Sequence, residues 1–162
     1  MDYYESIVLD YLRADRAVFV NRECCIQLKK QHNPDTSGPH WYCDAVAADF
    51  RSKTVFLCEI SYGSQLTALT KRLKAWQDHW ELIVGAIRRD SHLPEDWPIA
   101  VWLFVPKHLR SLLDKRLTQI REGGRLNFDY KITELEEVQP WLYCSWDRDG
   151  EPDKAEITPG PK

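Results

Sequence analysis

Residues 41–61 read WYCDAVAADFRSKTVFLCEIS, with a polar break at 51–53 between two hydrophobic runs. This pattern predicts two antiparallel strands joined by a tight turn. Side chains alternate between the faces of a strand, so Glu59 and Ser61 share one face of the second strand. A two-residue loop on Arg51 and Ser52 would place Asp44 opposite Glu59 on that face.

This acid pair is the first candidate site. Directly opposed residues of a hairpin have Cβ atoms ~5 Å apart, and like charges at that separation are unfavourable. Two such carboxylates share a proton or hold a cation, so Asp44 and Glu59 predict a divalent metal site. The alternative is a turn shifted by one residue. Asp44 would then lie on the opposite face, and Glu59 would pair with Lys53 or with a cation on a helix.

The rest of the chain predicts an α/β fold with a mixed sheet and helices on both faces. Apolar residues at helical spacing mark three helices, and three further apolar runs mark strands beside the hairpin. Turn-forming residues at 31–39 predict a loop, and Ser64 is expected to cap the central helix. The expected order is helix 2–14, strand 17–28 bent near Asn21, the two hairpin strands, helix 64–89, strand 99–105, a helix opened by Pro106 and ended by Gly123 and Gly124, and strand 130–133.

Length and composition are those of a single globular domain. The chain has 162 residues, of which 43% are hydrophobic. We expect residues 1–146 to form the domain and the polar residues 147–162 to form a loose tail. No apolar run approaches the ~20 residues that cross a bilayer, and the first residues lack the pattern of a secretory signal, so no membrane contact is expected.

The five cysteines include no CxxC pair. Cys43 and Cys58 fall on the apolar face of the hairpin and are expected to be buried, reduced thiols, which favours a cytoplasmic location. A redox or zinc role for the adjacent Cys24 and Cys25 is the alternative. Among the tryptophans, Trp41 and Trp97 are expected at the surface, whereas Trp141 and Trp146 are expected to pin the C-terminal segment.

Charge leaves the partner open. The net charge of −3 argues mildly against nucleic acid, but residues 134–162 hold eight acidic and three basic residues, so residues 1–133 carry a small positive excess. Basic side chains could track a phosphate backbone or could be solvated faces. The candidate nucleic-acid contacts are Arg51, Lys53, Lys71, Arg72, Lys74 and His40, the last being either a base-stacking group or an ordinary loop histidine.

Asp44, followed after 14 residues by Glu59-Ile60-Ser61, resembles the motif of the PD-(D/E)xK nuclease superfamily. The element order over residues 1–133 is similar to its restriction-endonuclease-like fold. The resemblance implies phosphodiester hydrolysis with Mg²⁺ or Mn²⁺. It also implies that Asp44, Glu59 and the Ile60 carbonyl hold the metal. A first-helix glutamate completes the site in many members, which suggests Glu5; the alternative for Glu5 is a first-turn acid favoured by the helix dipole.

The chain departs from the family motif at two positions. Cys43 stands in place of the proline, and the literal Pro34-Asp35 lies in the turn-rich loop. Ser61 stands in place of the lysine that supports the attacking hydroxide and the phosphate charge. Ser61 and Gln65 are the expected substitutes for orienting water or phosphate, with Lys71 as a more distant cation.

These features predict a nuclease that acts on DNA rather than RNA. Because a double strand needs two cuts, a homodimer is also expected. The rival hypothesis keeps the fold without the chemistry, as a catalytically inactive subunit that binds nucleic acid or a protein partner. A third hypothesis is a protein-interaction domain that uses the tail.

Overall fold

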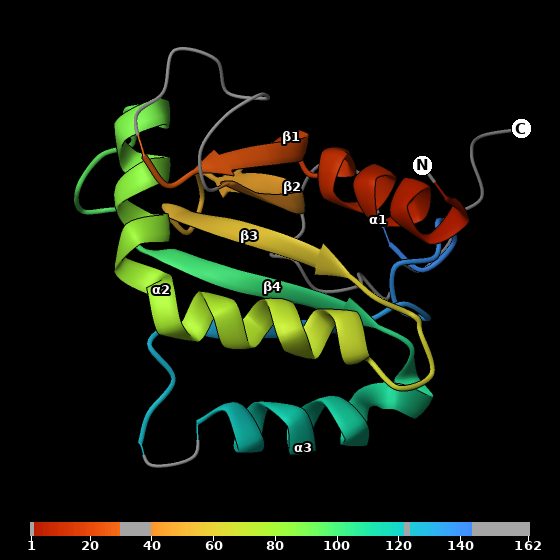
Figure 1. The fold of residues 1–162 in the computed structure, drawn as a ribbon. Helices are drawn as coiled ribbons and strands as arrows, with labels where there is room; N and C mark the ends of the chain where they lie inside the picture. The colour runs from red at the N-terminus through yellow and green to blue at the C-terminus, as the bar shows by residue number, and fades with distance from the viewer. Residues whose placement is uncertain (1, 30–39, 122–123, 144–162) are drawn as a thin grey trace, which may run out of the picture.

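The computed structural model describes residues 2–29, 40–121 and 124–143 (Figure 1). The predicted element order is confirmed, and the fold is of the α/β class. The expected 31–39 loop, Pro34, Asp35, Gly123, Trp146 and the 147–162 tail lie outside the described residues. The elements are α1 Tyr3–Ala14, β1 Val18–Gln27, β2 His40–Asp49, β3 Thr54–Ile60, α2 Thr67–Ser91, β4 Ile99–Val105, the short 3₁₀ helix η1 Lys107–Leu109, α3 Arg110–Ile120 and β5 Tyr130–Glu134.

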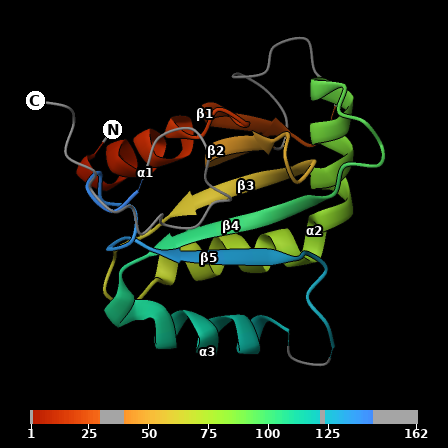
Figure 2. The same cartoon turned by 180° about the vertical axis from the view of Figure 1, so that it is seen from behind.

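The five strands form one mixed sheet in the order β1-β2-β3-β4-β5. β2 pairs antiparallel with both β1 and β3, whereas β4 pairs parallel with both β3 and β5. The carboxyl ends of β3, β4 and β5 therefore meet at one edge of the sheet, beside the first turn of α1 (Figure 2).

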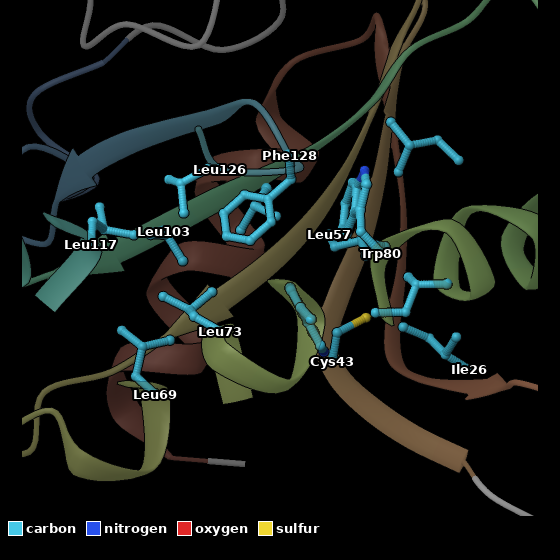
Figure 3. Close-up of a cluster of buried hydrophobic side chains, with 14 of the residues drawn as sticks. Ile26, Cys43, Leu57, Leu69, Leu73, Trp80, Leu103, Leu117, Leu126 and Phe128 are labelled. Carbon is cyan, nitrogen blue, oxygen red and sulfur yellow. The ribbon is translucent and has the colours of Figure 1, made fainter. Parts of the chain in front are cut away.

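Two hydrophobic clusters cover the two faces of the sheet, as expected for helices on both sides. The larger contains the buried stripes of α2 and α3 against one face, and Figure 3 shows part of it. The smaller joins α1 to the other face and to the segment that follows β5. All seven residues of β4 are buried, which fits a strand covered on both sides.

β1 and β2 exchange faces partway along their length. Val20 and Ala47 pack in the α1-side cluster, whereas Cys24 and Cys43 pack on the α2 side, although the register between the strands does not change. In a regular strand, residues an even number of positions apart share a face, and Val20 is paired with Ala47. Regular strands would therefore place all four side chains on one face. The exchange occurs at Glu23, whose φ of 49° is left-handed. The bend therefore lies at Glu23 rather than at Asn21.

This exchange alters the predicted places of the cysteines. Cys43 and Cys58 are both buried, as expected, but they belong to the clusters on opposite faces. Cys24, Cys25, Cys43 and Cys58 are free thiols.

The prediction that Ser64 caps the central helix is wrong. α2 begins at Thr67, and its cap residue is Leu66, with φ 51° and no side-chain cap bond. Leu66 is only 1% exposed, and its carbonyl accepts from the Thr70 N–H. Burial of Leu66 in the core thus sets the helix start. The third helix is also later than expected, since Pro106 precedes η1 and α3 starts at Arg110.

The expectations for the tryptophans are partly wrong. Trp141 is 74% exposed and so does not pin the chain, while Trp41 and Trp97 are half-buried against the α2-side cluster. Within the described ranges, no helix combines the length and apolar character needed to cross a membrane.

Candidate functional site

The hairpin has the register that brings the acid pair together. Ala45 pairs with Cys58 and Asp49 with Thr54, so the turn contains residues 50–53 rather than two residues. A four-residue turn in this register still aligns Asp44 with Glu59, as expected. The alternative, a turn shifted by one residue, is excluded. Asp49 closes the turn by accepting from the Arg51 N–H at 2.9 Å and from the Ser52 hydroxyl at 2.7 Å. Asp44 and Glu59 follow directly after the last pair.

Asp44 lies where β2 and β3 begin to separate. Its Oδ2 accepts a hydrogen bond from the Ile60 N–H at 2.7 Å, so the carboxylate takes the place of a backbone partner. This bond holds the half-buried acid against the carboxyl end of β3. Burial raises the pKa of Asp44, and the charges of Glu5 and Asp2 raise it further, against the lowering effects of the Ile60 N–H and Arg72.

Glu59 is the most deeply buried acid of the site. Its side chain is 2% exposed, and Oε2 forms an ion pair with Arg72 Nη1. Oε1 is buried and has no hydrogen-bond partner among the described residues. Burial and the nearby Asp44 charge outweigh the attraction of Arg72 and raise the pKa of Glu59 to about 8. Arg72 therefore does not fully compensate two ionised acids, and Glu59 keeps a proton up to about pH 8.

Arg72 is the cation that pairs with Glu59. It lies early in α2, beside the buried Leu73, and its side chain is 37% exposed. Sequence reasoning named Arg72 only as a phosphate contact and looked to Lys71 for the substitute charge, whereas the alternative interpretation paired Glu59 with an unnamed cation on a helix. The register of that alternative is wrong, but its helix cation is present as Arg72. The apolar stripe of α2 could have identified Arg72 from the sequence. Arg72 is next to Leu73 and three residues after Leu69, and such a position lies on the flank of the buried face.

The other motif residues lie at the same end of β3. The Ser61 N–H donates to the Phe104 carbonyl at 2.9 Å and so extends the pairing of β3 with β4. Gln65 is exposed in the turn before α2, and Lys71 and Lys74 are exposed on its outer surface. Ser61 directly follows Ile60, the hydrogen-bond partner of Asp44, whereas Gln65, Lys71 and Lys74 are exposed to solvent.

Glu5 is an acid in the first turn of α1, as its alternative interpretation predicted. Its N–H donates to Asp2 at 2.9 Å, and its side chain accepts from the Asp2 N–H, forming a capping box. Over residues 2–29, 40–121 and 124–143, no three His, Cys, Asp or Glu side chains gather as a metal-binding group. Glu5 is thus near enough for its charge to raise the pKa of Asp44, but among the described residues it does not gather with Asp44 and Glu59 into such a group.

The hairpin turn lies far from the acid pair. Five residues separate Asp44 from Asp49, or about 17 Å of strand, so Arg51 and Lys53 lie at the other end of the sheet. The Arg51 guanidinium instead binds Asp15, a 2% exposed carboxylate, with contacts of 2.9 and 3.0 Å. His40 lies at the start of β2, with its ring edge-on to Tyr42 at 5.5 Å.

Comparison with protein-family models, with curated proteins and with solved structures finds no match to this chain. The functional argument therefore rests on the geometry of the site.

Proposed function

We propose that this chain is a metal-dependent nuclease of restriction-endonuclease-like fold that hydrolyses phosphodiester bonds in nucleic acid, DNA rather than RNA. The observation that carries the proposal is the junction of Asp44 and Glu59 at the carboxyl end of β3, where Glu59 Oε1 is buried without a partner. The element order and the mixed sheet support it, because they match the arrangement that the motif implies.

The acid pair suits Mg²⁺ or Mn²⁺. These cations prefer oxygen ligands, and Asp44, Glu59 and the Ile60 carbonyl would hold the ion. The orphaned Glu59 oxygen and the raised pKa of both acids support this fit, because each signals negative charge that lacks compensation. When bound, such an ion lowers the pKa of its water and neutralises charge on the phosphate.

Arg72 is the residue that we assign to the scissile phosphate. A guanidinium offers several N–H donors in a plane, which suits the oxygens of a phosphate. Its partial exposure leaves its outer donors within reach of a substrate while its inner end neutralises Glu59. Ser61 follows the Ile60 partner of Asp44, and Gln65 is exposed in the turn before α2; under this proposal they would orient the attacking water or the phosphate.

Asp44→Ala tests the proposal. We expect the loss of Mg²⁺-dependent nicking of plasmid DNA with the fold retained, because half of the carboxylate pair is gone. Asp49→Ala is the matched control on the same strand and should keep cleaving, since Asp49 serves only the turn. Unchanged cleavage by Asp44→Ala would dismiss the assignment.

A second candidate function is a non-catalytic subunit that binds nucleic acid or a protein partner. The Arg72–Glu59 ion pair favours it, since that pair already satisfies one carboxylate oxygen. Nucleic-acid binding by the wild type without cleavage in Mg²⁺ or in Mn²⁺ would favour this candidate. Cleavage of both strands would require two copies of the chain, and sedimentation on duplex DNA tests that expected homodimer.

A further inference from the structure

A pocket of about 330 Å³ opens at the carboxyl ends of β3, β4 and β5. Tyr3 and Tyr4 line it from the first turn of α1, and Tyr62 lines it from the segment after β3. His108 comes from the segment after β4, and Glu136 comes from the segment after β5, which Figures 1 and 2 both show beside the start of α1. Ligands of open α/β sheets bind at this edge.

Three tyrosine rings form the aromatic side of the pocket. The rings of Tyr4 and Tyr62 lie 4.7 Å apart with 35° between their planes, and Tyr3 stands edge-on to Tyr4 at 5.5 Å. Tyr3 is 66% exposed and Tyr62 is 46% exposed, so these rings contribute little to the core. The Tyr62 hydroxyl donates to the Asp2 carboxylate, which fixes one ring against the helix start.

The pocket lies at the same end of β3 as the acid pair. Tyr62 follows Glu59 by three residues, and the bond from the Ser61 N–H to the Phe104 carbonyl holds this exit of β3 against β4. Asp2, the partner of Tyr62, is also close enough to Asp44 to raise the pKa of that acid. A strand with its scissile phosphate at Asp44 and Glu59 would therefore carry a neighbouring base past the tyrosines.

We propose that this pocket takes an unpaired nucleobase next to the scissile phosphate, so that the substrate is single-stranded or locally opened nucleic acid. The proposal rests on the proposed nuclease function. Every base has a face that stacks on an aromatic ring. Asp2 and Glu136 at the pocket repel phosphate, so an uncharged base is the part of the strand that enters. The volume lies at the small end of the ~300–1,000 Å³ range of ligand pockets and suits a single base.

Binding of fluorescein-labelled oligo(thymidine), followed by anisotropy in EDTA to prevent cleavage, tests the proposal. Tyr62→Ala should weaken binding roughly tenfold, within the range of a lost stacked base. Tyr62→Phe keeps the ring and loses only the bond to Asp2, so its affinity should stay within about twofold. Tyr3→Ala is a second variant that removes a ring without a hydrogen bond. Tyr130→Ala is the matched control, because Tyr130 is 43% exposed at the opposite end of β5.

Several outcomes would overturn the inference: wild-type affinity in both Tyr62→Ala and Tyr3→Ala, equal losses in Tyr62→Phe and Tyr62→Ala, or an equal loss in Tyr130→Ala. Equal weakening of binding to a blunt duplex would also contradict it. The nuclease proposal fails separately, if Asp44→Ala cleaves like the wild type. In that case, tyrosine-dependent binding would still establish the base site.

Discussion

Burial of Glu59 is unfavourable for the stability of the fold, whereas the proposed chemistry requires an acid at this position. A carboxylate that is 2% exposed is unfavourable unless it is compensated, and here one guanidinium compensates one of its two oxygens. Under the proposed function, a bound cation would supply the missing compensation for Glu59 and Asp44 together.

The raised pKa of Glu59 predicts that the metal-free protein loses stability as the pH rises. The folded state keeps a proton up to about pH 8, whereas the unfolded glutamate releases it near its ordinary value of 4.5. This contribution is fully present below the unfolded pKa and is lost as the pH passes through about 8, with a slope of at most about 1.4 kcal/mol per pH unit. Urea unfolding in EDTA between about pH 5 and about pH 9 measures it.

Glu59→Gln should flatten that profile, because glutamine does not titrate. Glu81→Gln, at an exposed position on α2, should leave the profile as steep as in the wild type. An unchanged slope in Glu59→Gln would show that another group is responsible.

Arg72→Ala distinguishes a phosphate-binding role from simple competition with the metal. If Arg72 stabilises the charge that develops on phosphate, kcat should fall roughly 100-fold, and Arg72→Lys should recover only part of it because an ammonium lacks the planar donors. Lys71→Ala is the control on the exposed surface of the same helix. An increase in the cleavage rate of Arg72→Ala would mean that the guanidinium only blocks the carboxylates.

The site was partly predictable from single residues. Strand alternation and the polar break were enough to align Asp44 with Glu59, because both depend on local geometry. A helix cation beside Glu59 was predicted only in the alternative with a shifted register, and Arg72 itself was not identified, since its reach depends on how α2 packs across the sheet. Arg51 and Lys53 were assigned to nucleic acid from charge alone, and charge does not reveal that the turn lies at the far end of the strands.

At the scale of elements, the exchange of faces in β1 and β2 could not be predicted. Valine and alanine occupy both faces of these strands, so the sequence shows no contrast in hydrophobicity between the two faces. The element order, by contrast, follows from long periodic segments such as α2. The start of α2 was mispredicted because capping preferences favour Ser64, whereas burial of Leu66 decided the outcome.

Glu23→Gly tests the exchange of faces. Glu23 is exposed and has a φ of 49°, a region that costs a residue with a side chain roughly 1 kcal/mol relative to glycine. We expect Glu23→Gly to leave the free energy of unfolding unchanged or raise it by up to about 1 kcal/mol, measured by urea unfolding. Arg22→Gly, at the adjacent exposed position with ordinary pairing to Ala45, should lower it. Equal losses in both variants would contradict the left-handed conformation at Glu23.

At the scale of the whole molecule, the two faces of one sheet pack against two hydrophobic clusters. The candidate site lies at the end of the sheet where both clusters stop. α1 closes one face and α2 the other, and the carboxyl ends of the parallel strands emerge between them. A metal held by Asp44 and Glu59 would thus link β2 to β3, the two strands of the hairpin. Its binding should stabilise the entire fold, because the unfolded chain holds no such pair.

Mn²⁺ should therefore raise the melting temperature of the protein. At a metal concentration 100 times Kd the expected stabilisation is about 2.7 kcal/mol, which corresponds to about 5–10 °C for a domain of this size. The rise should be larger at about pH 8.5 than at about pH 6.5, because binding must displace the proton that Glu59 keeps up to about pH 8. Glu59→Gln and Asp44→Asn should abolish the rise, while Asp49→Asn at the turn should retain it. An equal shift in Glu59→Gln would place the metal elsewhere on the molecule and remove the acid pair from the chemistry.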